Sequence, residues 1–558
     1  MELIGSDIKC YIYGLSISRK ALGDNAMKCV ELTVNFLEKG YFPDHLIPPF
    51  TVRNLRAAYR EILAHIRAQY PVKKGKRLDV PRARMVRHSV PKRKLSRRLL
   101  CIPNPLHHVL VSRELSKHWK KLDDFCSQSS ISLSRPIMGT ARALESKYSK
   151  ADQPRQRALR SVGKRYVLQA DFTRFYPSIY THAIPWAIHG KMEARSDATL
   201  YGNRIDERVR ESQDKQTGGV PIGPDTSFLV GEIVGTAVDR ALEEQLGPLS
   251  GTRFIDDFHL YFDSYQHAER ALAALHGIAV SLELEVNDFK TEIVQLPEAL
   301  EPKWKPELRS RTLTDAGTRL ETQLLELFDA ASDLARQFPH DNVLTYVARM
   351  VSTATIDSTN WPLCESLLLR SAIAEPATLK VMFDILRANA QNPINSSAIA
   401  VALDAICIHH APLQQGNEVL WALWVARSQN ITLGQPAVDA IGSLDDDLVA
   451  LAALHLRSEG LLPTLDTSLW EPYIGAEHLY SEHWLLAYEA LQKDWLRPTG
   501  GDYILNDPFF RILRAHDVSF YEVAATGQPP VSLYGDDDVL EDEDVDLTGV
   551  VETLNLPF

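Results

Sequence analysis

Several signatures of common protein classes are missing from this sequence. Its six cysteines lie far apart and form no Cys-x-x-Cys pair, which argues against a structural zinc site or a disulfide framework and fits a reducing cytoplasm. No run of eighteen apolar residues occurs, so we expect no membrane span. The first ten residues contain no basic region followed by an apolar core, so we expect no secretory signal. A chain of 558 residues, 45% hydrophobic and 24% charged, then predicts a soluble globular protein of three or four domains.

Charge is distributed unevenly along the chain. The net charge is −11, yet residues 1–150 hold 29 Lys and Arg against 12 Asp and Glu, a balance of 29 − 12 = +17. The remaining residues hold 32 basic and 60 acidic side chains, a balance of −28. The basic block is densest over residues 73–98, where 12 of 26 residues are Lys or Arg. Such a block indicates either contact with a phosphate-rich partner or a solvated basic loop, and charge alone does not decide between them.

Apolar spacing gives a coarse map of the elements. It predicts helices near residues 30–37 and 55–66, a strand at 99–102 that ends at Pro103, and one helix over 106–122. Residues 165–300 mix short strand-like runs with two helices. From about Glu321 to Tyr488, successive amphipathic helices with short polar breaks indicate an α-solenoid or an irregular helical domain. The acidic run 535–546 predicts a mobile tail.

Three constellations carry chemistry. An apolar run at 166–170 ends in Asp171, which places a carboxylate at the end of a buried strand. Apolar and aromatic residues flank the pair Asp256 and Asp257, as two strands of a hairpin flank a turn. Adjacent carboxylates repel one another unless a cation neutralises them, and Mg²⁺ prefers oxygen ligands. Between them, a glycine-rich loop at 218–227 leads into an apolar helix, a geometry that favours phosphate.

Each constellation alone has an ordinary explanation. Asp-Asp pairs occur at hairpin tips, and a glycine-rich loop before a helix can be a simple cap. The loop is not a Walker loop, because no Gly-Lys-Ser or Gly-Lys-Thr follows. The order and spacing of all three within about ninety residues, however, resemble motifs A, B and C in the palm of reverse transcriptases. Residues 180–191, 102–105 and 219–227 more narrowly resemble the abortive-infection (Abi) and defence-associated reverse transcriptases of prokaryotes.

The resemblance implies a fold of class α+β. Right-hand fingers and a palm with an antiparallel sheet would be followed by an all-α, helical-repeat-like C-terminal domain. The implied boundaries are 1–70 for an N-terminal helical segment, 71–165 for the fingers with the basic block, 166–310 for the palm, 311–530 for the helical domain and 531–558 for the acidic tail. Two departures from the family pattern occur: Phe254 replaces the commoner Tyr of motif C, and Gly218 replaces a Gln common in motif B.

The resemblance also implies roles for individual residues. Two Mg²⁺ ions, or Mn²⁺ as a substitute, would be held by the carboxylates of Asp171, Asp256 and Asp257 and by the backbone of Phe172. Lys290 would assist the triphosphate or the leaving pyrophosphate, with a plain surface lysine as the alternative. Tyr176 would be a steric gate that favours deoxynucleotides, with a core tyrosine as the alternative. The remaining nucleotide-binding residues would be Arg97, Arg98, Phe172, Gly219, Pro221 and Gly223. The expected nucleic-acid contacts are Lys73, Lys74, Lys76, Arg77, Arg82, Arg84, Arg87, Lys92, Arg93 and Lys94.

By resemblance, the function is antiphage defence through DNA synthesis from deoxynucleoside triphosphates in a bacterial cytoplasm, with no membrane association. Relatives either start untemplated DNA on a tyrosine hydroxyl of the protein or copy a dedicated non-coding RNA, and the sequence does not choose. The candidate priming residues are Tyr480, Tyr488, Tyr503, Tyr521 and Tyr534. Relatives assemble as trimers or hexamers, which implies a homo-oligomer. Two other classes remain open: a catalytically silent nucleic-acid-binding protein and a helical scaffold.

Overall fold

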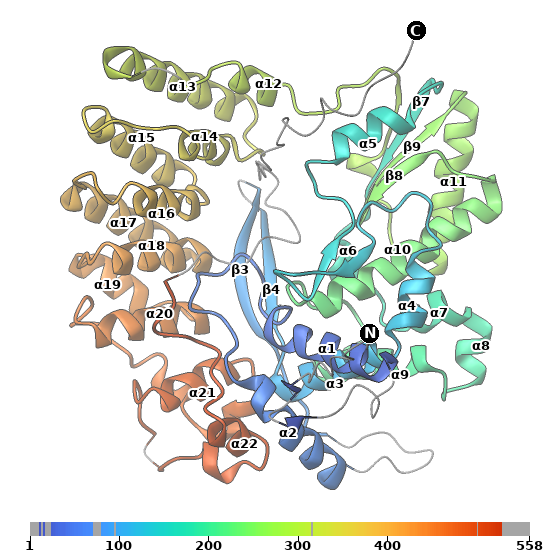
Figure 1. Ribbon diagram of the computed structural model, residues 1–558, viewed down its shortest axis with the longest axis horizontal. Coiled ribbons are helices and arrows are strands. Elements are labelled where there is room, and N and C mark those ends of the chain that lie inside the picture. The colour runs from blue at the N-terminus through green and yellow to red at the C-terminus, as the bar shows by residue number, and fades with distance from the viewer. Residues whose placement is uncertain are drawn as a thin grey trace, which may run out of the picture.

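The computed structural model describes residues 11–12, 15–16, 24–70, 80–93, 96–313, 316–498 and 500–526. The chain is mixed α+β, about 54% helical, with small antiparallel sheets. A curved array of helices lies on one side and the largest sheet with its helices on the other (Figure 1). A β-hairpin stands between them, above the N-terminal helices. The mixed class agrees with the prediction from the sequence.

The largest sheet has four strands in the order β10-β7-β9-β8, and every neighbouring pair is antiparallel. Its strands are β7 (Tyr166–Ala170), β8 (Gly251–Phe254), β9 (Asp257–Phe262) and β10 (Glu292–Gln295). The strand-helix pattern that the sequence predicts for this region is therefore confirmed as an antiparallel sheet. Helix α11 (Tyr265–Ser281) packs on β7, β9 and β10, and the apolar α10 (Asp225–Leu246) packs on α11.

The hairpin consists of β3 (Val86–Arg93) and β4 (Ser96–Ile102). Smaller antiparallel pairs are β1 (Tyr11–Ile12) with β2 (Leu15–Ser16), and β5 (Pro136–Met138) with β6 (Leu144–Ser146). The helices around the hairpin and the sheet are α1 (Asp24–Glu38), α2 (Leu55–Gln69), α3 (Pro105–Lys117), α4 (Trp119–Cys126), α5 (Gln153–Arg160), α6 (Phe175–Ser178), α7 (Ala183–His189), α8 (Lys191–Ser196), α9 (Tyr201–Glu211) and η1 (Asp288–Lys290).

The single helix predicted over residues 106–122 is wrong, because the chain forms α3 and α4 with a break at His118. The ring of His118 stacks on Tyr201 of α9, and its Nε2 atom lies 3.2 Å from the carboxylate of Glu114. These tertiary contacts fix a non-helical residue where local propensity favours continuity. The expectation of only two helices over 165–300 is also wrong, since the short helices α6, α7, α8 and α9 lie between β7 and α10.

The helical region begins at α12. Its helices are α12 (Trp304–Arg309), α13 (Gly317–Gln337), α14 (Val343–Ser352), α15 (Trp361–Ala374), α16 (Thr378–Ala388), α17 (Ser396–His410), η2 (Ala411–Leu413), α18 (Gly416–Ser428), α19 (Gln435–Gly442), α20 (Asp447–Ser458), η3 (Glu471–Tyr473), η4 (Ala476–Tyr480), α21 (Trp484–Gln492), η5 (Ile504–Asn506) and α22 (Phe510–Ala515). Alternate helices pack together from α13 to α20, as in stacked helical repeats. We call helices α13–α20 the helical array.

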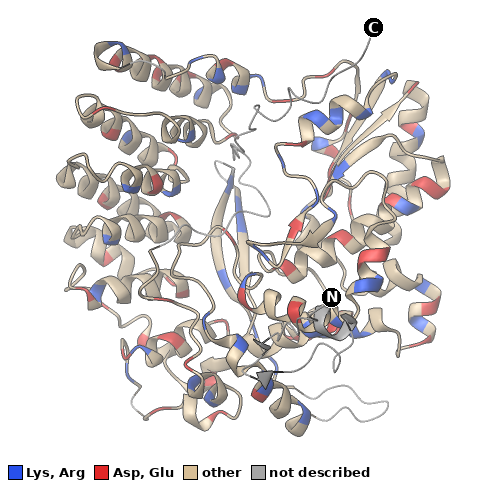
Figure 2. Cartoon of the chain, in the orientation of Figure 1, with Lys and Arg blue, Asp and Glu red and all other residues tan. Residues whose placement is uncertain are grey.

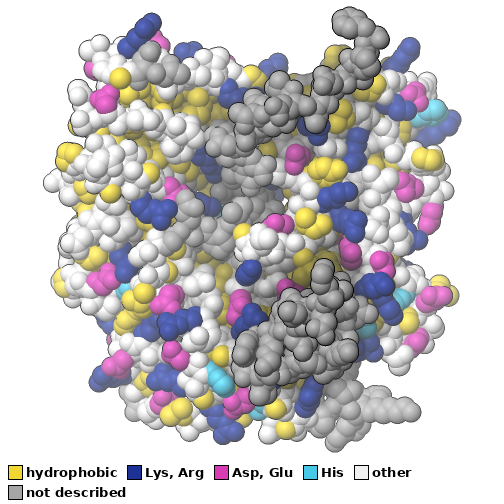
Figure 3. Space-filling model, viewed as in Figure 1, with side chains coloured by type: hydrophobic (Ala, Val, Ile, Leu, Met, Phe, Trp, Pro, Cys, Tyr) yellow, Lys and Arg dark blue, Asp and Glu magenta, His cyan; other side chains and the backbone are white. Residues whose placement is uncertain are grey.

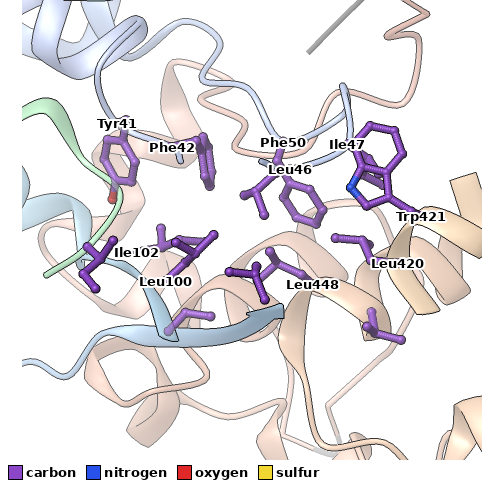
Figure 4. Packing of buried hydrophobic residues seen from close by; sticks show 14 of the residues in the cluster. Tyr41, Phe42, Leu46, Ile47, Phe50, Leu100, Ile102, Leu420, Trp421 and Leu448 are labelled. Carbon is purple, nitrogen blue, oxygen red and sulfur yellow. The ribbon is translucent and has the colours of Figure 1, made fainter. Parts of the chain in front are cut away.

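The end of the helical region packs back onto the N-terminal helices and the hairpin. The rings of Tyr41 and Phe520 lie 5.6 Å apart, and Arg53 and Ser519 exchange backbone hydrogen bonds. The indole of Trp484 donates a hydrogen bond to the carbonyl of Ile102 at 3.3 Å. One hydrophobic core therefore runs through both regions (Figure 4). This contact closes the chain around a central space.

One segment among the described residues, Ser396–Leu413, is long and apolar enough to cross a membrane by length and composition, with a mean hydropathy of 1.3. It comprises α17 and η2, and it packs against α15, α18 and α19. Its outward face exposes Val401 and Ile408, and hydrophobic side chains are visible over the upper helices of the array in Figure 3. The absence of a membrane span stays a prediction. The acidic tail lies outside the described residues.

Candidate functional site

A cavity of about 2090 Å³ occupies the central space. Its walls come from the four-stranded sheet, the β3–β4 hairpin, the glycine-rich loop before α10, and the helical region. All three predicted acidic residues line it: Asp171, Asp256 and Asp257. Residues that are 86 positions apart in sequence therefore share one site.

Antiparallel pairing explains how the carboxylates meet. Asp171 directly follows β7, while Asp256 lies in the turn between β8 and β9, and Asp257 begins β9. Because Ala170 pairs with Phe258 on the neighbouring strand, the end of β7 lies beside this turn. Desolvation raises the pKa of Asp256 to about 7, and the carboxylates of Asp171 and Asp257 add to the shift. Carboxylates this close together take up a proton more readily in the absence of a cation. A bound divalent cation would instead stabilise their ionised forms.

Mg²⁺ fits these residues on a second observation. The Oδ1 atom of Asp171 is buried, and no described residue gives it a hydrogen bond. Among the described residues, no three His, Cys, Asp or Glu side chains are arranged so that together they could hold a metal ion in this conformation. An open arrangement suits Mg²⁺, which takes one or two carboxylates and fills its other positions with water and substrate phosphates. Phe172, the predicted backbone ligand, has a buried side chain stacked on Phe175 and edge-on to Phe258.

Three cations surround the carboxylates. Lys290 forms an ion pair with Asp171, and Arg157 of α5 donates a hydrogen bond to Asp257 at 3.1 Å. Desolvation lowers the pKa of the Lys92 ammonium, and the nearby charges of Arg98 and Lys290 lower it further. Lys290 therefore lies beside the three predicted carboxylates, as the sequence indicated. Lys92, predicted as a nucleic-acid contact, is close enough to act on Asp171 and Asp256 as well.

The two adjacent arginines of β4 have different surroundings. The guanidinium of Arg97 donates to Ser89 and forms a bidentate ion pair with Glu418 of α18, with Nη2 to Oε2 at 2.9 Å. Its donors therefore tie the hairpin to the helical array, although the residue also lines the cavity. Arg98 lines the cavity and acts on the charge of Lys92. The contact of either arginine with a triphosphate stays a prediction.

The glycine-rich loop is held against the residues that follow Asp171. Gly219 has a φ of +82° and donates its N–H to the carbonyl of Ile179, and Val220 donates to Tyr176. Gly219, Pro221 and Tyr176 line the cavity. Tyr176 packs over Gly231 of α10, where an added Cβ would come within 2.9 Å of its ring. This packing fixes the ring where the sequence predicts a gate.

Gly223 is placed differently from the prediction. It does not line the cavity, and a Cβ on it would meet the ring of Pro43 at 2.5 Å and the carbonyl of Cys101 at 3.3 Å. With a φ of +136°, the position needs glycine for backbone geometry and for close packing between the loop, β4 and the N-terminal segment. Its predicted contact with the nucleotide is therefore corrected to a packing role.

The basic block is only partly described. Lys73, Lys74, Lys76, Arg77 and Lys94 lie outside the described residues, as does the side chain of Arg93. Arg84 pairs with Glu482 at 3.2 Å and with Asp214 at 3.6 Å. Arg82 and Arg87 are exposed, and Arg87 lines the cavity. The nucleic-acid role of this block stays a prediction.

Four of the candidate priming tyrosines lie away from the cavity. The hydroxyls of Tyr488 and Tyr503 donate to backbone carbonyls in the core, at 2.8 and 2.6 Å. Tyr521 is fully buried against His455, and Tyr480 contacts Asp507 at 3.3 Å. All four hydroxyls are hydrogen-bonded, and the side chains are buried except that of Tyr480, which is half-buried, so none is a ready nucleophile in this conformation. The fifth candidate, Tyr534, lies outside the described residues.

Sequence reasoning missed two contributors. Arg157, whose guanidinium contacts Asp257, lies in a run with seven Lys and Arg and one acidic residue over residues 147–165, a signal that the denser earlier block overshadowed. Arg253, in β8 beside the turn that presents Asp256, forms buried ion pairs with Glu232 and Asp239 of α10. No pattern in the sequence links these three residues.

Comparisons with known proteins give little further support. No protein-family model and no curated protein matches the chain. Among solved structures, apo telomerase from Candida tropicalis is 12% identical over 72% of each chain, with a TM-score of 0.29. Telomerase from Candida albicans, in complex with a fragment of telomeric RNA, is 12% identical over 62% of this chain and 66% of that chain, with a TM-score of 0.28. At such TM-scores the likeness supports neither a fold family nor a function for this chain.

Proposed function

We propose that this protein is a DNA polymerase of the reverse-transcriptase type that joins deoxynucleotides by a two-metal mechanism. The observation that carries the proposal is the meeting of Asp171 with Asp256 at adjacent ends of antiparallel strands, where desolvation and mutual repulsion raise the pKa of Asp256 to about 7. Placing like charges together in this way costs stability unless a bound cation offsets it. A function that needs divalent cations accounts for the arrangement.

The residues of the cavity have complementary roles. Asp171, Asp256 and Asp257, with the backbone of Phe172, would hold Mg²⁺, which when bound activates a 3′-hydroxyl and stabilises the leaving pyrophosphate. Lys290 gives up its ion pair with Asp171 and turns to the phosphates. Arg98 and Lys92 bind the triphosphate from the hairpin.

Sugar selection falls to Tyr176. Its ring is packed on Gly231 and lines the cavity five residues after Asp171, so a ribose 2′-hydroxyl would meet a ring that cannot withdraw. Deoxynucleotides are therefore the proposed substrates. Antiphage defence, a bacterial cytoplasmic location and assembly as a trimer or hexamer belong to the same proposal and rest on the motif resemblance.

The choice between priming modes is an experimental one. Protein-primed, untemplated synthesis would use a hydroxyl outside these four hydrogen-bonded tyrosines, and the alternative is copying of a dedicated non-coding RNA. Purified protein is incubated with Mg²⁺ and labelled deoxynucleotides, first alone and then with RNA transcribed from the neighbouring genomic sequence. The Asp256→Asn, Asp257→Asn double variant is the matched control.

The products are separated on a denaturing gel before and after protease. Label that stays with the protein until digestion, and that the double variant does not produce, supports protein priming. Label that appears only with added RNA supports templated synthesis. No incorporation under either condition, with folded protein, would contradict the proposed function.

A further inference from the structure

The cavity is electrically polarised. Near the catalytic carboxylates, its lining includes Lys150 and Arg157 beside α5, Lys305 and Arg309 on α12, and two carboxylates, Glu292 and Glu301, of which Glu301 pairs with Arg309. Its other end, beside α20 and α21, is lined by five carboxylates and two arginines. These are Asp214, Asp445, Asp446, Asp447, Glu482, Arg84 and Arg87. A polyanion therefore meets an attractive end and a repulsive end in one cavity.

The carboxylates of the acidic end are fixed in place. Asp446 caps α20 by accepting from the backbone of Leu448 and Val449, and it also contacts His88 of β3 at 2.7 Å. Asp447 accepts from the backbone of Leu486 and from His483. These hydrogen bonds hold α20, α21 and the hairpin together, so the carboxylates of Asp446 and Asp447 stay in place and repel phosphate groups.

The basic end continues onto the surface. Residues 147–165 carry seven Lys and Arg and one acidic side chain, and in Figure 2 blue segments mark these Lys and Arg positions along α5. Lys147, Arg155 and Arg165 are exposed on this stretch. We call residues 147–165 the α5 surface. On this surface, the ammonium of Lys147 lies 5.3 Å from the centre of the Tyr148 ring.

The α5 surface is joined directly to the reacting centre. Arg157 holds Asp257, and Arg160 donates to the carbonyl of Gly251 at the start of β8. The side of the cavity next to α12 is joined to the same sheet, because the carboxylate of Glu298, shortly before α12, accepts a hydrogen bond from the side chain of Gln169 in β7. A nucleic-acid strand whose end lies at Asp171 and Asp256 therefore has Lys150 and Arg157 on one side and Lys305 on the other, where Arg309 is paired with Glu301.

We propose that single-stranded nucleic acid reaches the catalytic carboxylates through the opening between α5 and α12, with its phosphodiester backbone on the α5 surface. This inference rests on the proposed polymerase function and identifies the path of the strand. Lys and Arg bind such a backbone by releasing counterions, so affinity falls as salt rises. The acidic end directs the strand to this one side of the cavity.

The test measures binding without catalysis. Fluorescence anisotropy follows a labelled 20-nucleotide oligonucleotide, as DNA in one arm and RNA in the other, with full-length protein in EDTA and no nucleotides. The variant Lys147→Glu, Arg155→Glu, Arg165→Glu changes three exposed residues outside the catalytic centre. The matched control is Arg336→Glu, Arg497→Glu, which reverses exposed charges in the helical region.

The expected result is a loss of affinity of about tenfold or more in the triple variant, with a shallower dependence of log Kd on log salt by about 2 for three contacts. The control variant should bind like the wild type, and both should keep their unfolding midpoints. Loss in only the DNA or only the RNA arm also supports the path and identifies the strand. Unchanged binding in both arms would overturn it. A protein that binds through this surface but never incorporates nucleotides would refute the polymerase function and leave the surface intact.

Discussion

The Nη1 atom of Arg253 donates a hydrogen bond at 2.8 Å to the carbonyl oxygen of Ile255, the residue immediately before Asp256. Ile255 has a φ of +59°, a strained value for a β-branched residue. The Ser134 hydroxyl accepts from its N–H at 2.8 Å. The turn that presents the carboxylates is therefore held in an unfavourable conformation by neighbours with fixed positions.

The first prediction concerns the buried support of this turn. Arg253→Met leaves Glu232 and Asp239 buried without their cation, so the free energy of unfolding should fall by about 3–5 kcal/mol. Arg240→Met on α10, the helix that carries Glu232 and Asp239, is the matched control, because its partner Glu244 is exposed and 3.8 Å away. Denaturant unfolding measures both variants, and equal losses would contradict the assigned role of Arg253.

The second prediction separates Arg97 from Arg98. Arg97→Ala should destabilise the fold by about 2–4 kcal/mol, because Glu418 would be buried without its partner, and Glu418→Gln should relieve part of that loss in the double variant. Arg98→Ala should leave unfolding nearly unchanged and raise the KM for deoxynucleotides by about tenfold. A raised KM in the Arg97 variant alone would reverse the assignment.

The third prediction tests the gate. Tyr176→Val should remove the ring that lies over Gly231 and admit a ribose 2′-hydroxyl. The ratio of kcat/KM for dATP over ATP should fall by about tenfold or more, which corresponds to ~1.4 kcal/mol of discrimination. Tyr180→Val, outside the cavity lining, is the control. An unchanged ratio in the Tyr176 variant would assign that tyrosine to the core instead.

The fourth prediction concerns acid stability. Burial lowers the pKa of His107 and of His108 to about 4, and each neutral ring donates to a backbone carbonyl. Below about pH 6.5 these histidines bind protons in the unfolded chain but stay neutral in the folded chain. The free energy of unfolding should therefore fall between pH 6.5 and 4. His108→Gln should remove its share of this slope, about 3 kcal/mol. Parallel pH profiles for the variant and wild type would contradict the assignment.

The sequence predicted the site better than its surroundings. Apolar runs that end in Asp171 and surround Asp256 define local structure, so the strand end and the hairpin could be read directly. The helices over 317–458 followed from their amphipathic spacing in the same way. Local pattern was enough because each feature lies within a short stretch of chain.

Contacts between distant segments could not be predicted. The pair Arg97 with Glu418 joins residues 321 positions apart, and His88 with Asp446 joins residues 358 apart. Nothing in the local pattern of either partner signals the other. For the same reason, the resemblance could assign Gly223 to the nucleotide, whereas the close approach of Pro43 explains the glycine.

In the proposed function, Asp256 helps to hold the Mg²⁺ ions that the transfer of deoxynucleotides requires. The most direct test is the initial rate of labelled dNMP incorporation against Mg²⁺ concentration, for wild type and Asp256→Asn, with the unfolding midpoint of each recorded. We expect Mg²⁺-dependent incorporation that Asp256→Asn abolishes, while the unfolding midpoint of this variant without metal rises because a repelling carboxylate is gone. Incorporation by the variant at the wild-type rate would contradict it.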